Sequence, residues 1–343
     1  MSIQSSVSNR RLRGLARRAR GPLISDAAWS RIEGVYPGLP TVMTAGFECR
    51  LDDDSQVDVA IDLKRAEAAP EAMPAGAGWD ALRSIGAEWA DPNSCLHAAV
   101  GDLWLEFDLD GGGRMAPGVF LTLVRDWRGP LAPLVESAAR AFGCPPPPNT
   151  GPNLDSLVAA LPPGGRVVRL GVMFGRGGTA TRVELRLPPP TARGTLERLG
   201  WRDAGDDFDP TLAALEPQVD ALNLDLDLGE RVEPRLGIEC LLRRPPRLEP
   251  RWAALVGGLV DAGLCRRDKA EHLLAWPGGH RVRASSGSTD ELEEICVRQI
   301  SHLKLTYAGR LIAAKAYLMF RHVACEPGFV RPGRMDGSTT RPA

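Results

Sequence analysis

Charged and amide side chains alternate with apolar residues along the segment LNLDLDLGERVEPRLGIECLL, residues 222–242. Its polar positions include Asn223, Asp225, Arg235 and Glu239. A period of two places every second side chain on one face of a β-strand, so the segment predicts two strands with one polar face, joined by a turn. Carboxylates on such a face can accept protons and guanidinium groups can bind anions, if the face lines an enclosed space and not bulk solvent.

The same alternation recurs in four other parts of the chain. The predicted hairpins lie near residues 43–63, 103–124, 166–187, 222–242 and 301–320. Each has a tip with glycine or aspartate, which is the sequence signal of a β-hairpin. The alternation places six basic side chains on the polar faces: Arg169, Arg182, Arg186, Arg235, Lys304 and Lys315. Glu48, Glu106 and Glu184 lie on the same faces, so acids and bases occur together.

Helical periodicity fills the spacers between the hairpins. Segments such as WDALRSIGAEWA, LAPLVESAARAFG and PRWAALVGGLVDAGL have apolar residues at spacings of three and four. Each spacer has room for about two helices, and the residues before the first hairpin can supply the first pair. The chain therefore predicts five ααββ units with a repeat of roughly 55 to 80 residues. We expect an α+β fold with a single domain over residues 1–326 and a disordered tail over residues 327–343.

Ten antiparallel strands in one sheet leave two exposed edges unless the sheet closes on itself. The apolar side of each hairpin must pack on the neighbouring helices, so the polar side must face the axis of the resulting barrel. A ten-stranded barrel is wider than the eight-stranded barrels whose interiors side chains just fill, so we expect a solvated central chamber. An open antiparallel sheet, with helices on one face and water on the other, would give the same alternation.

The segment KAYLMF in the last hairpin sets Lys315 two residues before Tyr317. Five ααββ units, a polar-lined ten-stranded antiparallel β-barrel and this Lys-x-Tyr pair resemble the ABBA-type prenyltransferases, a barrel family of enzymes that prenylate indoles, phenols and peptides. In that family, Lys-x-Tyr pairs bind and shield the isoprenoid diphosphate. Arg182 and Arg235 occupy the equivalent positions of earlier hairpins, but no tyrosine follows them, and the whole chain has only 3 tyrosines.

The resemblance implies that cations stabilise a departing diphosphate when an allylic C–O bond breaks. The candidates for this contact are Arg169, Arg182, Arg186, Arg235, Lys304, Lys315 and Tyr317. The ring faces of Trp104 and Tyr317 would shield the allylic cation. His302 also lies on an inner face by alternation, where we expect a hydrogen-bonded wall residue and not a base.

Carboxylates would fill two further roles. Glu106, Glu48 or Glu184 can act as the base that removes a proton from the acceptor, once the lumen is desolvated. Asp108 and Asp225 would hold Mg²⁺ that bridges the diphosphate, because hard cations prefer oxygen ligands. No organic cofactor is expected. For each of these residues the alternative is a cross-strand ion pair in which acid and base only neutralise each other.

The bulk composition excludes several classes of protein. The chain has 343 residues with 43% hydrophobic and 25% charged residues, as soluble globular proteins do. A net charge of -1 gives no reason to expect a nucleic-acid partner, and no stretch approaches the roughly 20 apolar residues of a membrane span. The 7 cysteines are scattered without a CxxC pair, and the N-terminus lacks the apolar core of a signal peptide, so we expect reduced thiols and a cytoplasmic location.

One local exception is the basic run NRRLRGLARRARG at residues 9–21, which contains no acid. We expect a solvated helix face or a frayed terminus there. The alternative is a segment that grips an acidic leader peptide, a phosphate or a nucleic acid.

Three hypotheses for the function follow. The first is an enzyme, a prenyltransferase that moves an isoprenoid from its diphosphate to an aromatic or peptide acceptor in specialised metabolism. The second is a non-catalytic barrel that binds a peptide or a small metabolite, which the low aromatic content of 6% favours. The third is an open-sheet scaffold without a ligand.

Overall fold

A computed structural model of the chain describes residues 11–12, 14–15, 18–53, 56–65, 67–68, 77–109, 117–173, 180–202, 205–282 and 294–324. Within these residues, eleven strands form one antiparallel sheet. They are β1 (Thr44–Arg50), β2 (Val57–Leu63), β3 (Val100–Phe107), β4 (Gly118–Leu123), β5 (Arg166–Val172), β6 (Thr181–Arg186), β7 (Ala221–Leu228), β8 (Val232–Leu241), β9 (Gly278–Val282), β10 (Glu294–Tyr307) and β11 (Leu311–Ala324). The predicted tail at 327–343 lies outside the described residues.

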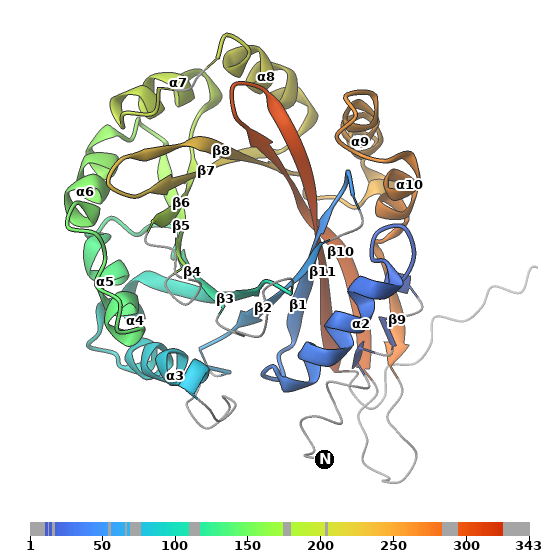
Figure 1. Cartoon of the computed structure of the whole chain (residues 1–343), viewed down its shortest axis with the longest axis horizontal. Helices are drawn as coiled ribbons and strands as arrows, with labels where there is room; N and C mark the ends of the chain where they lie inside the picture. Colours follow the sequence, from blue (N-terminus) through green and yellow to red (C-terminus); the bar gives the residue numbers. More distant parts are fainter. Residues whose placement is uncertain are drawn as a thin grey trace, which may run out of the picture.

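The sheet closes because β11 pairs with β1 on one side and with β10 on the other. The ten strands β1 to β8, β10 and β11 form the barrel wall, which Figure 1 shows as a ring. The prediction of a closed ten-stranded antiparallel barrel is therefore confirmed. The open-sheet scaffold is wrong, because the pairing of β1 with β11 removes both free edges of the ring.

The last hairpin is longer than predicted. β10 begins at Glu294, seven positions before the predicted start at residue 301, and its first residues pair with β9 from Glu294 opposite Val282 to Arg298 opposite Gly278. β9 is thus an eleventh strand outside the five predicted hairpins. A register shift between Ile300 and His302 interrupts the period of two, which is why the alternation did not extend back to the true start of β10.

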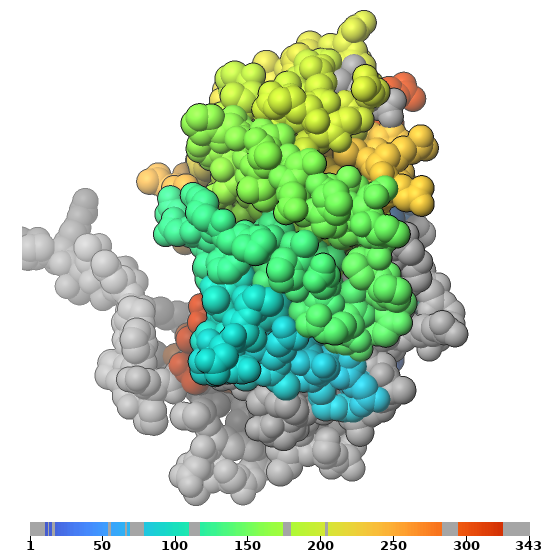
Figure 2. All heavy atoms as spheres, turned by 90° about the vertical axis from the view of Figure 1, so that its left-hand side faces the viewer, coloured from blue at the N-terminus to red at the C-terminus, as the bar shows by residue number. Residues whose placement is uncertain are grey.

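Helices cover the outside of the barrel. They are α2 (Asp26–Val35), α3 (Ala77–Ala90), α4 (Cys95–Ala99), α5 (Ala132–Ala141), α6 (Thr150–Ala160), α7 (Pro189–Arg198), α8 (Phe208–Leu215), α9 (Arg251–Asp261) and α10 (Arg267–Ala275), with short 3₁₀ turns at Tyr36–Gly38, Glu216–Gln218 and Pro246–Leu248. Each spacer between hairpins holds two α-helices, as predicted. Figure 2 shows one side of the molecule, on which the segments from α3 to α8 form a continuous outer layer.

Local signals set the ends of several helices. The Ser25 hydroxyl oxygen accepts a hydrogen bond from the Ala28 backbone N–H at 3.2 Å and caps the start of α2. α7 begins with Pro189 and Pro190, in the first turn where a missing N–H leaves no helical hydrogen bond unmade. After α5 the chain turns at Gly143, whose φ of 63° lies in the left-handed region that favours glycine.

The hydrophobic core lies between the barrel and the helices. The Trp29 ring of α2 packs edge-on against Phe47 of β1 with centroids 6.0 Å apart, and Phe47 lies 5.2 Å from Phe320 of β11. All three rings are buried. Because the apolar faces of the strands pack outward on the helices, their polar faces point to the barrel axis. Among the described helices, none has the length and apolar character needed to cross a membrane.

Candidate active site

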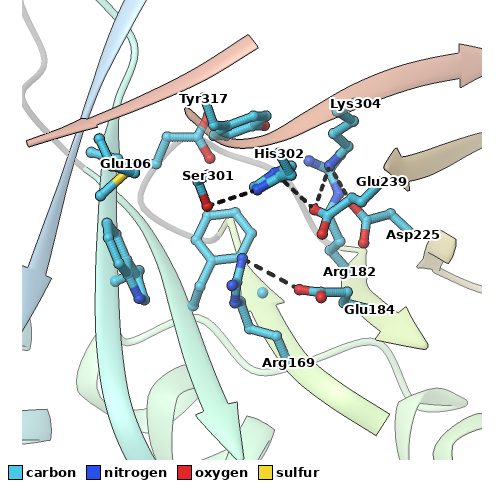
Figure 3. Close-up of a pocket in the computed structure, with 15 residues that line it drawn as sticks. Glu106, Arg169, Arg182, Glu184, Asp225, Glu239, Ser301, His302, Lys304 and Tyr317 are labelled. Atoms are coloured by element: carbon cyan, nitrogen blue, oxygen red, sulfur yellow. Dashed lines mark hydrogen bonds and ion pairs between the residues drawn. The ribbon is translucent and has the colours of Figure 1, made fainter. Parts of the chain in front are cut away.

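The inner faces of the strands enclose a cavity whose empty space, including the part open to solvent, is about 650 Å³. Its walls come from β2 to β8, β10 and β11. The residues that line it are Ala60, Trp104, Glu106, Phe120, Arg169, Gly171, Arg182, Glu184, Asp225, Glu239, Ser301, His302, Lys304, Tyr317 and Met319. Figure 3 shows these side chains converging from opposite strands, so the polar faces line a shared interior.

Carboxylates pair with the cations of the cavity. The Lys304 ammonium donates to Asp225 and lies 4.0 Å from Glu239. An Nη1 of Arg169 is 3.3 Å from Oε2 of Glu184. The strand register brings these groups together, because Lys304 is opposite Glu239 and Arg169 is opposite Glu184. The cross-strand pairs considered from the sequence are therefore present in the barrel.

A third cation is paired in the same way. Arg182 donates to both carboxylate oxygens of Asp227, at 2.8 and 2.9 Å, in a bidentate contact. Four carboxyl groups and three cations line the cavity, besides His302 and Tyr317. The lining therefore carries no surplus of positive charge for an anionic ligand.

A β-bulge places two neighbouring residues in the cavity. The register shift between Ile300 and His302 turns both Ser301 and His302 inward, and Ser301 Oγ is 3.1 Å from His302 Nδ1. The imidazole stacks on Tyr317 with centroids 4.1 Å apart, and its Nε2 is 3.4 Å from Oε1 of Glu239. Burial lowers the pKa of His302 to about 4, so the ring is neutral near pH 7. This agrees with the expected wall residue.

Glu48 binds both residues of the Lys-x-Tyr pair, of which Tyr317 lines the cavity and Lys315 lies beside it. The Lys315 ammonium and the Tyr317 hydroxyl both donate to the Glu48 carboxylate, and Tyr317 is directly opposite Glu48 across β1 and β11. Burial alone would raise the pKa of Glu48, but the charge of Lys315 and the two hydrogen bonds lower it to about 2. Glu48 is therefore ionised near pH 7 and is a weak base.

The other predicted bases differ in their protonation. Burial raises the pKa of Glu184 to about 8; the charge of Arg169 opposes this shift, and those of Glu239 and Asp225 add to it. Glu184 therefore keeps its proton near pH 7 and cannot accept another. Of the three carboxylates predicted as bases, this leaves Glu106, which lines the cavity and is half-buried.

Asp58 makes stability depend on pH. Burial, and then the charge of Glu48, raise the pKa of its carboxyl to about 7, whereas an unfolded aspartate has a pKa of about 3.9. Between about pH 4 and pH 7 the folded state therefore holds a proton that the unfolded state has released. The stability that this proton contributes is fully present below about pH 4 and is lost as the pH rises towards 7.

We therefore expect Asp58→Asn to be more stable than wild type at pH 8, by at least about 1 kcal/mol, with a smaller difference at pH 5. The asparagine oxygen can still accept the Leu109 N–H bond, which is 3.2 Å long in the wild type. Thermal unfolding at both pH values measures the effect, and the exposed Asp155→Asn is the control. A difference that is larger at pH 5 than at pH 8 would contradict the assignment.

Two inward-facing glycines make room for long neighbours. A Cβ on Gly237 would lie 2.8 Å from Lys304 Cε and 3.0 Å from Asp225 Cβ. A Cβ on Gly171 would lie 2.7 Å from the Phe120 ring. The missing side chains therefore admit the Lys304–Asp225 pair and the Phe120 ring into the lumen.

The structure brings most of the predicted site residues together. Those that line the cavity are Trp104, Glu106, Arg169, Arg182, Glu184, Asp225, Lys304 and Tyr317. Three lie apart from it. Arg235 is exposed at the start of β8, Asp108 is exposed beyond the end of β3, and Arg186 lines a separate depression with Arg166. Alternation predicts the face on which a side chain lies, but not its depth along the barrel axis.

Among the described residues, two groups of three carboxylates have oxygens close enough to hold a metal ion. They are Glu48, Asp58 and Glu106, and Glu184, Asp225 and Glu239. Asp108 belongs to neither group, so the structure does not bring the two predicted Mg²⁺ ligands together. In the second group, Oδ1 of Asp225 is buried without a hydrogen bond within the described part of the chain, so this group fits a cation.

Sequence reasoning assigned no role to Phe120, Glu239 or Ser301, which also line the cavity. Glu239 was already on a polar face, and the alternation of GVFLTL around Phe120 could have placed that ring inside. No signal pointed to Ser301, because a β-bulge has no reliable mark in a single sequence.

The closed ten-stranded barrel with its helical coat is the architecture of the prenyltransferase-barrel proteins. The chain is similar to the crystal structure of the prenyltransferase PriB in its apo form, with a TM-score of 0.50 and 14% identity over 94% of this chain and 96% of that chain. A second similar structure is 5-dimethylallyl tryptophan synthase from Streptomyces coelicolor in complex with DMASPP and Trp, with a TM-score of 0.44 and 17% identity over 99% of each chain. No protein-family model and no curated protein matches the chain. The resemblance to the prenyltransferase fold that the sequence suggested is thus confirmed as a likeness of structure.

Proposed function

We propose that this protein transfers an isoprenoid from its diphosphate to an aromatic or peptide acceptor inside the barrel. The observation that carries the proposal is a cavity in which cations, carboxylates and aromatic rings meet, with Trp104, Phe120 and Tyr317 among its walls. Specialised metabolism in the cytoplasm is the setting that we predict from the sequence, and it belongs to the same proposal.

The reaction needs three things of these residues. When the allylic C–O bond breaks, its electron pair leaves with the diphosphate oxygen. Lys304 and Arg169 in the cavity, and Lys315 beside it, stabilise the negative charge of the departing diphosphate. The rings of Trp104 and Phe120 face the cation that remains. The acceptor forms the new bond to that carbon and loses a proton to Glu106.

The existing ion pairs set a condition on donor binding. Since Lys304 already contacts the Asp225 carboxylate, a diphosphate must compete with Asp225 for it. Arg169 contacts Glu184, which is protonated near pH 7 and competes less. A Mg²⁺ ion held by Glu184, Asp225 and Glu239 would supply positive charge next to the diphosphate. We propose this group in place of the Asp108–Asp225 pair.

Binding and product formation test the proposal together. The protein is incubated with dimethylallyl, geranyl or farnesyl diphosphate, with and without Mg²⁺, and its melting temperature is followed. We expect one of these donors to raise the Tm by several degrees, and the Lys304→Met variant to lose that rise. Mass spectrometry of a mixture of indole, phenol and peptide acceptors then shows whether a prenyl group is added. Absence of both stabilisation and product with all three donors would contradict the proposal.

A second candidate function is a non-catalytic barrel that binds a peptide or a metabolite. The specific observation in its favour is that Lys304, Lys315 and Arg182 are each paired with a carboxylate, so that the cavity as described is not a strongly cationic diphosphate site. Binding of a peptide without response to any diphosphate would favour this function.

A further inference from the structure

Arginines gather at one end of the barrel, outside the cavity described above. Arg125, Arg128, Arg166, Arg186 and Arg243 line one depression there, with Asp126 as its single acid. They come from the ends of β4, β6 and β8 and the start of β5, where the strands connect to helices and not to hairpin turns. Within the described part of the chain, none of the five forms an ion pair.

This clustering costs free energy in the isolated protein. Arg166 and Arg186 are directly opposite each other across β5 and β6, and like charges in that position destabilise a sheet. Burial, and then the charges of Arg166 and Arg243, lower the pKa of Arg186. The whole chain has a net charge of -1, so the excess of positive charge is local. An anionic partner is the ligand that would relieve it.

A second depression continues the first, since Arg243 lines both. It adds three arginines, Arg244, Arg247 and Arg298, to an apolar floor. The floor consists of Leu242, Trp252, Val297 and Ile300. Leu248 follows Arg247 directly in the chain. Leu248 is 56% exposed and Val297 42%, which makes them two of the most exposed large apolar residues among those described.

The charge continues on the neighbouring N-terminal segment. Arg18 is exposed and lies close enough to Arg298 to lower its pKa, an effect second only to that of burial. Arg11 of the same segment is instead buried against Glu294 at 2.7 Å and anchors the segment to the start of β10. The basic run at 9–21 is therefore neither fully solvated nor frayed where it is described: part of it packs on this end of the barrel.

We propose that the two depressions form one docking groove for an acidic peptide segment that also carries apolar side chains. Charge complementarity favours a polyanion, and the exposed Leu248 and Val297 beside the arginines favour a peptide over a compact phosphate, which would leave the apolar floor unused. A nucleic-acid duplex would likewise leave that floor uncovered, because its outer surface is phosphate and sugar.

The groove lies next to the cavity. Arg186 Nε donates to the Asn223 side-chain oxygen at 2.8 Å, and the Asn223 amide donates in turn to Glu184, which lines the cavity. Arg186 and Glu184 are two positions apart on β6, about 7 Å. Arg186 and the buried Asn223 therefore connect the groove to the wall of the cavity. A role of the bound peptide as the acceptor rests on the proposed transferase. Its binding does not.

Fluorescence polarisation tests the groove without any isoprenoid. The probe is a fluorescein-labelled twelve-residue peptide of alternating Glu and Leu at 50 mM NaCl. We expect saturable binding that weakens at least about 10-fold at 500 mM NaCl.

The double variant Arg166→Glu/Arg243→Glu should weaken peptide binding by at least about 10-fold. The matched control is Arg310→Glu, an exposed arginine in the turn between β10 and β11 at the opposite end of the barrel, which should leave binding unchanged. Thermal unfolding confirms that each variant is folded.

Three competitors separate this proposal from other anions. A peptide with Ser in place of Leu should bind at least about 5-fold more weakly, because it cannot use the apolar floor. Equal binding of the Ser peptide, displacement of the probe by inorganic pyrophosphate at low micromolar concentration, or tighter binding of a twelve-nucleotide single-stranded RNA would each overturn it. If the peptide binds but no donor is turned over, the groove stands and the transferase fails; the reverse result leaves the transferase and rejects the groove.

Discussion

A Glu48→Gln variant is expected to unfold with a free energy about 3 kcal/mol below that of the wild type. Glu48 is 3% exposed and accepts hydrogen bonds from both Lys315 and Tyr317. Glutamine removes the charge that balances the Lys315 ammonium, and water has little access to replace it. Urea unfolding followed by tryptophan fluorescence measures the difference.

The double variant Glu48→Gln/Lys315→Met is the control for this result. It removes both charges, so it should be more stable than Glu48→Gln alone, although it still loses the charged acceptor of the Tyr317 hydroxyl. A Glu48→Gln variant within about 0.5 kcal/mol of the wild type would show that solvent screens the pair and that the cluster is not a buried one.

The Glu106→Gln variant should lower kcat for isoprenoid transfer by at least about 100-fold, while the donor raises the Tm as it does in the wild type. Glutamine keeps the shape of the side chain but cannot take the acceptor's proton. Glu48 cannot replace it, because Lys315 and Tyr317 hold that carboxylate as a weak base. The initial rate of product formation at pH 7, measured by chromatography, checks this expectation.

Two comparisons sharpen that experiment. Glu136→Gln, on the exposed face of α5, is the matched control and should not change kcat. If the kcat of Glu106→Gln at pH 7 stays within about 3-fold of the wild-type value, the assignment of the base to Glu106 is wrong.

Period-two alternation predicted the strands and their faces well, because the face of a strand is a local property. Phe47 was assigned to the apolar side and is buried in the core between barrel and helices, and Lys304 was assigned to the polar side and lines the cavity. The rule failed at the bulge before His302, where one extra residue turns Ser301 into the lumen as well. It also misplaced Arg235, because the start of β8 runs beyond the enclosed part of the barrel.

Local patterns were enough for the order of the ααββ units, for the inward direction of the polar faces and for the Lys-x-Tyr pair in the last hairpin. They could not predict which acid each cation would meet. Tyr317 donates to Glu48, 269 positions away, and Lys304 to Asp225, 79 positions away. The register in which β11 joins β1, and β10 joins β8, creates these contacts. That register depends on how the entire barrel packs and closes, so no short stretch of the chain encodes it.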